Sequence, residues 1–376
     1  MKFALLNADA DTVRYVAALL AGGHELTLID AAPQAASLAA AADLDVRRIT
    51  AWEEALACGA NFVVVGTEAP EAVRLEQLQR LAQEGMPTLF LHPQSASTLA
   101  YLELDMHRQA SNTALVPLES TRHRVEIGQL AELGRCDEVI VEHRLPQSTK
   151  AETLARFIRD IGAVRRLTGP CEKVSAMGTL GDDTTPAQLG VQISTTSGAL
   201  IRWTVGATRD AETATWRVLC NGAVGETVVD ADGSRRFTLT RNGQAETATI
   251  SPADDVQAAT VAAAAAVQDT NNLLWREALA DLELVEALER SLRKGRTVEL
   301  FHEEASEEGT FHGVMAAGGC LLLMVAIGLS IAVTIIGRFK FAVADIWPKA
   351  LLAVLGLFLL MQLLKFVFPP RGPADR

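Results

Sequence analysis

Residues 2–30, KFALLNADADTVRYVAALLAGGHELTLID, decide the fold of this chain. The run KFALLN (2–7) is apolar enough for a buried first strand, and residues 12–20 have the spacing of an amphipathic helix. HELTLID (24–30) has the pattern of a second strand that ends in an acidic residue, Asp30. The stretch therefore predicts a strand–turn–helix–strand unit of a parallel sheet.

This order is that of the Rossmann dinucleotide-binding unit, in which an acid about 20 residues after the turn binds the ribose. A GxGxxG turn would place glycine at positions 7, 9 and 12, but the chain has Asn7, Asp9 and Thr12. The Asp9 side chain fills the space through which a pyrophosphate approaches the backbone, and it adds negative charge. Asp9 or Asp11 is best suited to capping the helix. We expect the fold, but not NAD binding in the usual manner.

The next segments continue the alternation of strands and helices. NFVVV (61–65) and PTLFL (87–91) are apolar runs suited to buried parallel strands, and residues 71–84 form a predicted helix. A helix near residues 97–109 and a strand near 115–117 complete the pattern. We predict a Rossmann-type domain over residues 1–120.

The second half of the chain changes period and predicts a sheet with short connections. After a predicted helix at 151–167, short β-rich stretches are separated by turns such as Asn221-Gly222 and Asn242-Gly243. Residues 258–295 return to a helical pattern before a last short strand, TVELF (297–301). We predict an α+β domain with an open antiparallel sheet over residues 121–302.

Composition excludes some functions. The formal net charge of −12 and the pI near 5.1 argue against nucleic-acid binding, which needs clustered Lys and Arg. The cysteines form no CxxC pair and no metal-ligand spacing, so we predict no metal site. We expect most of them to be small core residues of a reduced compartment: Cys58, Cys136, Cys171, Cys220 and Cys320.

The C-terminal part has the composition of a membrane anchor. Residues 313–337 carry no charge, and a second apolar run ends at residue 368. Each run is long enough to cross the roughly 30 Å hydrocarbon core as a helix. We predict a two-helix transmembrane hairpin, with spans at 313–337 and 348–368, after an acidic linker at 303–312. We expect no signal peptide, because residues 3–6 already belong to the first predicted strand. We therefore expect the cell membrane as the location, with the soluble domains in the cytoplasm.

Short segments spread along the chain resemble the glucose–fructose oxidoreductase/inositol dehydrogenase (Gfo/Idh/MocA) family. GMPTLFLHP (85–93) lies where that family has G-K-H-V-x-x-E-K-P, and Arg122-His123, followed by Gly134 and Val139, resembles its R-[FH]…G-x-x-G-x-V crossing. Further similarity lies at 159–176, with the pattern H-x-x-D…G-x-P…V-x-A, and at 281–298, with D…S…G-R-x-V. The resemblance covers about residues 1–300. It implies a Rossmann domain, an open-sheet domain and NAD or NADP as cofactor.

The resemblance also implies where catalysis would occur. The family's E-K-P lysine lies beside substrate and nicotinamide, and this position is His92, which could serve as an acid or base instead. The family's helix His and Asp fall on Arg159 and Gly162, and a shifted alignment brings in Asp160. His92 is otherwise a hydrogen-bonded residue at the end of a strand.

Other residues are assigned to cofactor and substrate by the same resemblance. Arg122 anchors the crossover through a salt bridge or faces a ligand, and Arg159 either binds an anionic ligand in the cleft or is solvated. Both are candidates for the substrate cleft. The candidate cofactor-binding residues are Asn7, Asp9, Thr12, Asp30, Thr67 and Pro93, although Asp30 also suits a simple turn.

Two functions remain open from the sequence. The favoured one is a membrane-anchored, weakly active or non-catalytic protein of this fold that senses a small sugar-like ligand or acts as a scaffold. The alternative is an active NAD(P)-dependent dehydrogenase of a sugar-like or cyclitol substrate, with His92 as acid/base. A subunit role in a larger membrane assembly is a third hypothesis. By analogy with the family, the sheet is a surface for homo-oligomerisation.

Overall fold

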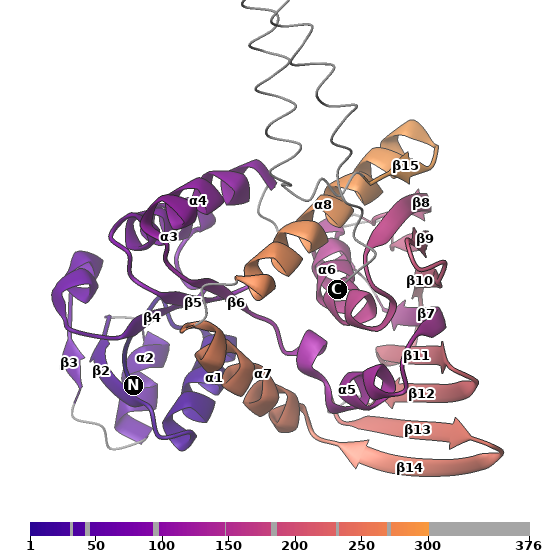
Figure 1. The fold of residues 1–376 in the computed structure, drawn as a ribbon, viewed down its shortest axis with the longest axis horizontal. Helices are drawn as coiled ribbons and strands as arrows, with labels where there is room; N and C mark the ends of the chain where they lie inside the picture. Colours follow the sequence, from indigo (N-terminus) through magenta and orange to yellow (C-terminus); the bar gives the residue numbers. More distant parts are fainter. Residues whose placement is uncertain are drawn as a thin grey trace, which may run out of the picture. The chain divides into compact units, whose positions relative to one another are not determined.

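A six-stranded parallel sheet forms from residues 2–118 in the computed structural model (Figure 1). The order β3-β2-β1-β4-β5-β6 is that of a doubly wound sheet, with β1 and β4 at its centre. Every neighbouring pair is parallel. The strands are β1 (Lys2–Leu6), β2 (Glu25–Ile29), β3 (Arg47–Arg48), β4 (Phe62–Val65), β5 (Thr88–Leu91) and β6 (Leu115–Leu118). The predicted Rossmann-type sheet is confirmed.

The structure describes residues 1–30, 33–41, 46–92, 98–146, 148–181, 186–230, 233–268 and 272–300. The predicted acidic linker (303–312) and the two predicted membrane spans (313–337 and 348–368) lie outside these residues. None of the helices within them is both long enough and apolar enough to cross a bilayer.

Helices cover both faces of the first sheet. The four residues of β4, FVVV, are all fully buried, which explains why the sequence has no polar residue there. One apolar cluster packs around α1 and α2, and a second around α3 and α4. These helices and a short 3-10 turn, η1, span Ala10–Ala21 (α1), Pro33–Ala41 (α2), Trp52–Ala57 (η1), Glu71–Gln83 (α3) and Thr98–Ser111 (α4).

The second sheet has nine strands, in the order β14-β13-β12-β11-β7-β10-β9-β8-β15. The prediction of an antiparallel sheet is wrong at one place, because β7 and β10 pair in parallel. After β7 the chain passes through a helix and enters β8 in the direction of β7. The strand β9 runs antiparallel to β8, and β10 runs antiparallel to β9, so β10 again has the direction of β7. The strands are β7 (Cys136–Leu145), β8 (Cys171–Thr179), β9 (Gln188–Thr195), β10 (Leu200–Ala207), β11 (Thr213–Cys220), β12 (Ala223–Val229), β13 (Arg235–Arg241), β14 (Gln244–Ile250) and β15 (Val298–Glu299).

Local sequence signals define the helices of the second half. Capping boxes start α6 at Thr149 and α7 at Ser251, and Gly295 ends α8 in the left-handed conformation. These helices and the crossover turn η2 span Thr121–His123 (η2), Val125–Glu132 (α5), Lys150–Thr168 (α6), Pro252–Ala266 (α7) and Leu273–Lys294 (α8).

The last two helices join the halves of the molecule. Figure 1 shows α7 and α8 between the two sheets. Ala259 and Ala263 of α7 belong to the core of the first sheet around β1, and Trp275 of α8 stacks on Tyr101 of α4 with 5.3 Å between ring centroids. The predicted boundary after residue 120 separates the two sheets but not their helical layers. Residues 1–302 form one compact unit.

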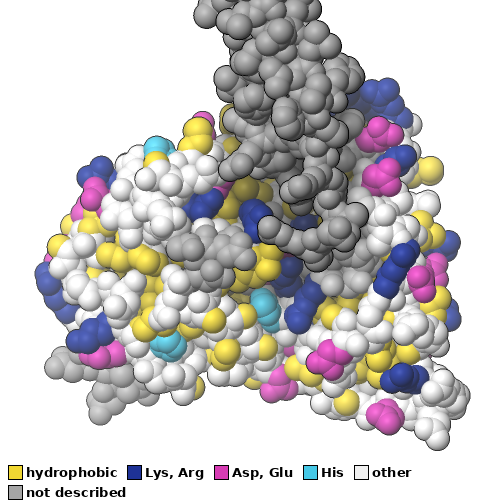
Figure 2. Space-filling view, viewed as in Figure 1, with side chains coloured by type: hydrophobic (Ala, Val, Ile, Leu, Met, Phe, Trp, Pro, Cys, Tyr) yellow, Lys and Arg dark blue, Asp and Glu magenta, His cyan; other side chains and the backbone are white. Residues whose placement is uncertain are grey.

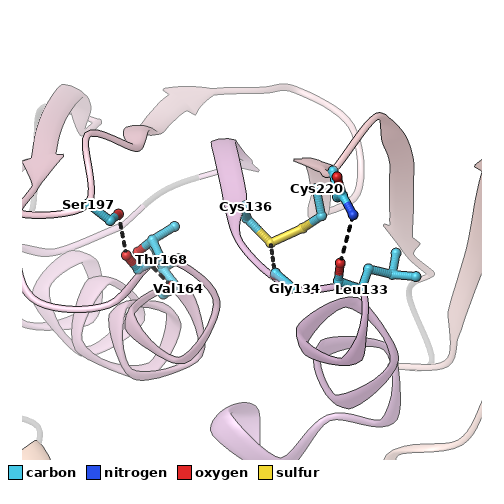
Figure 3. The surroundings of a disulfide bond; sticks show 8 residues. Leu133, Gly134, Cys136, Val164, Thr168, Ser197 and Cys220 are labelled. Atoms are coloured by element: carbon cyan, nitrogen blue, oxygen red, sulfur yellow. Dashed lines mark hydrogen bonds between the residues drawn. A yellow bond between two sulfur atoms is a disulfide. The ribbon is translucent and has the colours of Figure 1, made fainter. Parts of the chain in front are cut away.

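A disulfide joins Cys136 of β7 to Cys220 of β11 (Figure 3). The expectation of reduced core cysteines is wrong for this pair. The two residues are 84 positions apart and become neighbours only because β7 and β11 pair with Cys136 opposite Cys220. Their spacing along the chain therefore gave no signal. Cys171 is buried and free, as expected, and Cys58 is half-buried and free.

Charged side chains of both signs lie interspersed on the face seen in Figure 2, with apolar side chains between them. Inside the molecule, one ion network stands out. Arg235 of β13 is 3 % exposed and pairs with Glu126 of α5 and Asp255 of α7, each at 2.7 Å. Both carboxylates are also buried, so the guanidinium compensates their charges where water cannot.

Replacing Arg235 by alanine should lower the free energy of unfolding by about 3–5 kcal/mol, because two buried carboxylates lose their partner. Arg236→Ala is the matched control, since the adjacent arginine is exposed and pairs only loosely with Asp230, at 3.4 Å. We expect its effect to stay within about 0.5 kcal/mol. Urea unfolding of both variants measures the difference, and equal effects would contradict the role of the network.

Candidate functional site

The Asp9 carboxylate fills the turn where a phosphate would bind in a dinucleotide fold. Its Oδ1 accepts hydrogen bonds from the backbone N–H groups of Asp11 and Thr12, at 2.8 and 2.9 Å. Its Oδ2 accepts from the Thr12 hydroxyl at 2.7 Å, and from the backbone N–H and hydroxyl of Thr67 at 2.6 and 2.8 Å. The helix-capping role predicted for Asp9 is confirmed.

This carboxylate is a fixed negative charge. Partial burial raises the pKa of Asp9, but the hydrogen bonds from Thr12 and Thr67 lower it more, so the net pKa lies below the usual value. Donors that would face an anion at the start of α1 are therefore already paired with an ionised group.

The rest of the turn is closely packed. Asn7 has a left-handed backbone (φ 53°), its N–H donates to the Asp30 carboxylate, and its side-chain amide donates to Gln77 at 2.6 Å. Gly66, after β4, leaves no room for a side chain, because an added Cβ would lie 2.2 Å from the Asn7 carbonyl oxygen. Asp30 thus contacts the turn itself.

Five of the predicted cofactor residues therefore gather at the carboxyl ends of β1, β2 and β4: Asn7, Asp9, Thr12, Asp30 and Thr67. Their role toward a cofactor stays a prediction. The sixth, Pro93, lies outside the described residues.

A pocket of about 550 Å³ lies beside this turn, along the carboxyl edge of the first sheet. Ligands of open α/β sheets bind at such an edge. Part of the wall comes from the ends of β4, β5 and β6 and the loops that follow them. The helices α1 and α3 provide another part, and α6 and α7 contribute one residue each. The lining residues are Asp11, Arg14, Tyr15, Thr67, Ala69, Glu71, Arg74, Leu91, His92, Leu118, Glu119, Ser120, Thr121, Arg159 and Val256.

Three arginines bring positive charge to the pocket. Arg74 is only 6 % exposed, and within the described residues it pairs with no carboxylate and its Nε has no hydrogen-bond partner. Arg159 is exposed, and its Nε donates to the Ala155 carbonyl of its own helix at 3.1 Å. Arg14 pairs with Asp11 at 3.2 Å near the surface. Because buried charges are normally paired, Arg74 is the cation best suited to an incoming anion.

Hydroxyl groups add polar contacts. Burial raises the pKa of the Tyr15 phenol to about 12, so it stays protonated beside Ser120. Thr67 and Thr121 line the same pocket.

His92 meets two acidic side chains that the sequence analysis did not select. It follows β5, Glu119 follows β6, and Asp281 comes from α8. One possible ligand atom of each lies within 4.8 Å of the others. Oε1 of Glu119 and Oδ2 of Asp281 are buried without a hydrogen-bond partner in the described part of the chain. Burial and the nearby Asp281 charge raise the pKa of Glu119 well above its usual range.

The position of Glu119 also explains why residue 162 is a glycine. A Cβ at position 162 would lie 2.4 Å from Oε1 of Glu119. The resemblance expects an acidic side chain from position 162, and Glu119 brings a carboxyl group against that position from another element. The sequence did contain one signal for Glu119. This residue directly follows the buried strand LVPL, so it lies at the carboxyl edge of the sheet, where sites form.

Two predicted residues lie away from the pocket. Asp160 is 4 % exposed and faces the second sheet, where its Oδ2 lies 2.6 Å from Nε2 of His143 and accepts from the Trp203 indole at 2.8 Å. It does not line the pocket. Arg122 pairs with Glu277 of α8 at 3.3 Å, which matches the expected anchor of the crossover.

No protein-family model matches this sequence, and no curated protein is significantly similar to it. Solved structures do match the fold. A myo-inositol dehydrogenase from Corynebacterium glutamicum is 18 % identical, with a TM-score of 0.63, over 80 % of this chain and 99 % of that one. The fold is that of the Gfo/Idh/MocA oxidoreductases.

Further neighbours support the same Gfo/Idh/MocA fold. GenD2 from gentamicin A biosynthesis, solved with NAD, is 19 % identical, with a TM-score of 0.64, over 80 % of this chain and 96 % of that one. An aldose–aldose oxidoreductase from Caulobacter crescentus, solved with glycerol, is 16 % identical, with a TM-score of 0.64, over 80 % and 99 %.

Asp9→Ala should lower the free energy of unfolding by about 1–2 kcal/mol, because it removes the cap of α1 and the link to Thr67. Asp11→Ala removes an exposed carboxylate from the same turn of helix and should change stability by no more than about 0.5 kcal/mol. Chemical denaturation compares the two. A loss for Asp9→Ala no larger than that for Asp11→Ala would show that the carboxylate does not organise the turn.

Proposed function

We propose that this protein binds a small acidic, sugar-like ligand in the pocket and does not transfer hydride to or from NAD(P). The observation that carries the proposal is the Asp9 carboxylate, which accepts five hydrogen bonds where a dinucleotide would place its pyrophosphate. A pyrophosphate there would meet an ionised carboxylate that already accepts from the N–H groups of Asp11 and Thr12.

The pocket supports the ligand class. Its volume of about 550 Å³ is within the usual range for small-molecule sites. Arg74 offers a guanidinium that pairs with no carboxylate among the described residues, and Arg159 adds a second cation that a carboxylate can reach. The hydroxyl groups of Tyr15, Thr67 and Thr121 suit the hydroxyls of a sugar.

The proposed setting is the cell membrane. Two apolar segments, 313–337 and 348–368, would anchor the folded unit. Figure 1 shows α5 and α6 on one face of the second sheet. Its other face is the surface through which two copies would associate.

A second candidate function is supported by the position of His92. It lines the pocket at the position where the resemblance to the Gfo/Idh/MocA family implies an acid/base beside the substrate. An active sugar or cyclitol dehydrogenase is therefore the competing proposal. Binding of the cofactor decides between the two.

The full chain in detergent should show no saturable NADH or NADPH fluorescence change up to about 1 mM, because Asp9 withholds the phosphate donors. Asp9→Gly should gain measurable binding. Thr149→Ala, which removes the cap of α6 instead, is the control and should gain none. Micromolar binding by the unaltered chain would overturn the proposal. Turnover that His92→Ala abolishes and surface His107→Ala retains would then establish the dehydrogenase.

Glucuronate should raise the melting temperature by about 2 °C or more near tenfold saturation, whereas glucose should not, since only the acid engages Arg74. Arg74→Gln should remove the shift. Arg80→Gln is the control on the same helix, because Arg80 is exposed and pairs with Glu84. Equal shifts with both sugars, or a shift that persists in Arg74→Gln, would contradict an acidic ligand.

A further inference from the structure

Beyond ligand binding, we propose that His92, Glu119 and Asp281 bind one divalent transition-metal ion at the base of the pocket. The three residues come from the ends of β5 and β6 and from α8, and each offers a ligand atom within 4.8 Å of the other two. An ion at their centre would draw these atoms slightly together, since metal–ligand bonds are about 2.0–2.2 Å long.

The carboxyl groups carry the strongest argument. Asp281 is 0 % exposed, yet its Oδ2 accepts no hydrogen bond within the described residues. Oε1 of Glu119 is also buried and also accepts no hydrogen bond within the described residues. Two buried carboxyl oxygens without donors are costly, and a single cation between them would satisfy both.

The surrounding residues hold Asp281 in place. Its other oxygen, Oδ1, accepts from Nη1 of Arg165 at 2.6 Å. Arg165 also pairs with Glu277 at 2.8 Å, and Glu277 pairs with Arg122. Such outer contacts fix a ligand's orientation and leave its second oxygen for the metal.

The local charge admits a cation. Glu119, Glu277 and Asp281 are three acids against two bases, Arg122 and Arg165, so these groups sum to one negative charge when ionised. A divalent ion would leave one positive charge beside the pocket.

The ligand set selects the metal. Calcium and magnesium prefer oxygen alone, whereas one imidazole with two carboxylates suits zinc, manganese, iron or cobalt. His92 and Glu119 line the pocket, so the open side of the ion would face it. If the proposed function holds, the carboxylate or a hydroxyl of a sugar acid would complete the coordination.

The test uses the full chain in detergent, freed of metal by chelation and titrated without cofactor or sugar. Calorimetry with Zn²⁺ and visible absorption with Co²⁺ should both give one ion per chain. His92→Ala and Glu119→Gln should each weaken binding by about tenfold or more. His107→Ala should leave it unchanged, because the His107 ring hydrogen-bonds with Gln79 and Gln83 and does not line the pocket.

Three results would overturn the site. One is the absence of stoichiometric binding by folded protein. Another is unaltered affinity in Glu119→Gln, which would mean that Glu119 holds a proton there. The last is a thiolate-type cobalt spectrum that Cys58→Ser abolishes. Because no organic ligand is present, these outcomes are independent of the cofactor and sugar titrations.

Discussion

The contact between Arg165 and the acids of α8 holds the two halves of the molecule in register. Arg165 belongs to α6, against the second sheet, and its partners Glu277 and Asp281 belong to α8, which also packs on the first sheet. Glu277 in turn pairs with Arg122 of the crossover. Buried ion pairs are poor sources of net stability, but removing one partner is severe. The network therefore joins α6, α8 and the crossover by contacts that are costly to break.

Within that frame, the site lies on the Gfo/Idh/MocA fold and has a particular distribution of charge. An internal carboxylate stands at the start of α1, where the fold family implies an external phosphate. The arginines of the pocket lie on α1, α3 and α6. The carboxyl groups of Glu119 and Asp281 lie close to His92.

Local patterns predicted the elements well, because FVVV, the capping residues and the Asn-Gly turns act through near neighbours. The predictions missed what depends on distant contacts. Asp9 meets Thr67 across 58 positions, Cys136 meets Cys220 across 84, and Glu119 meets Asp281 only after α8 returns to the first sheet. The parallel pairing of β7 with β10 likewise follows from the path of the chain. The periodicity of the sequence does not predict contacts between residues so far apart in the chain.

The disulfide between β7 and β11 has a consequence for cell biology. Thioredoxin and glutathione keep such thiols reduced in the cytoplasm, whereas secretory compartments leave them oxidised. The bond encloses α6 and β8 to β10 in a covalent loop. Closing a loop of this length lowers the entropy of the unfolded chain and so stabilises the fold by about 4.5 kcal/mol. If the proposed anchor holds the protein in a membrane, the oxidation state of these two sulfurs in living cells would therefore record which side of the bilayer the folded unit occupies.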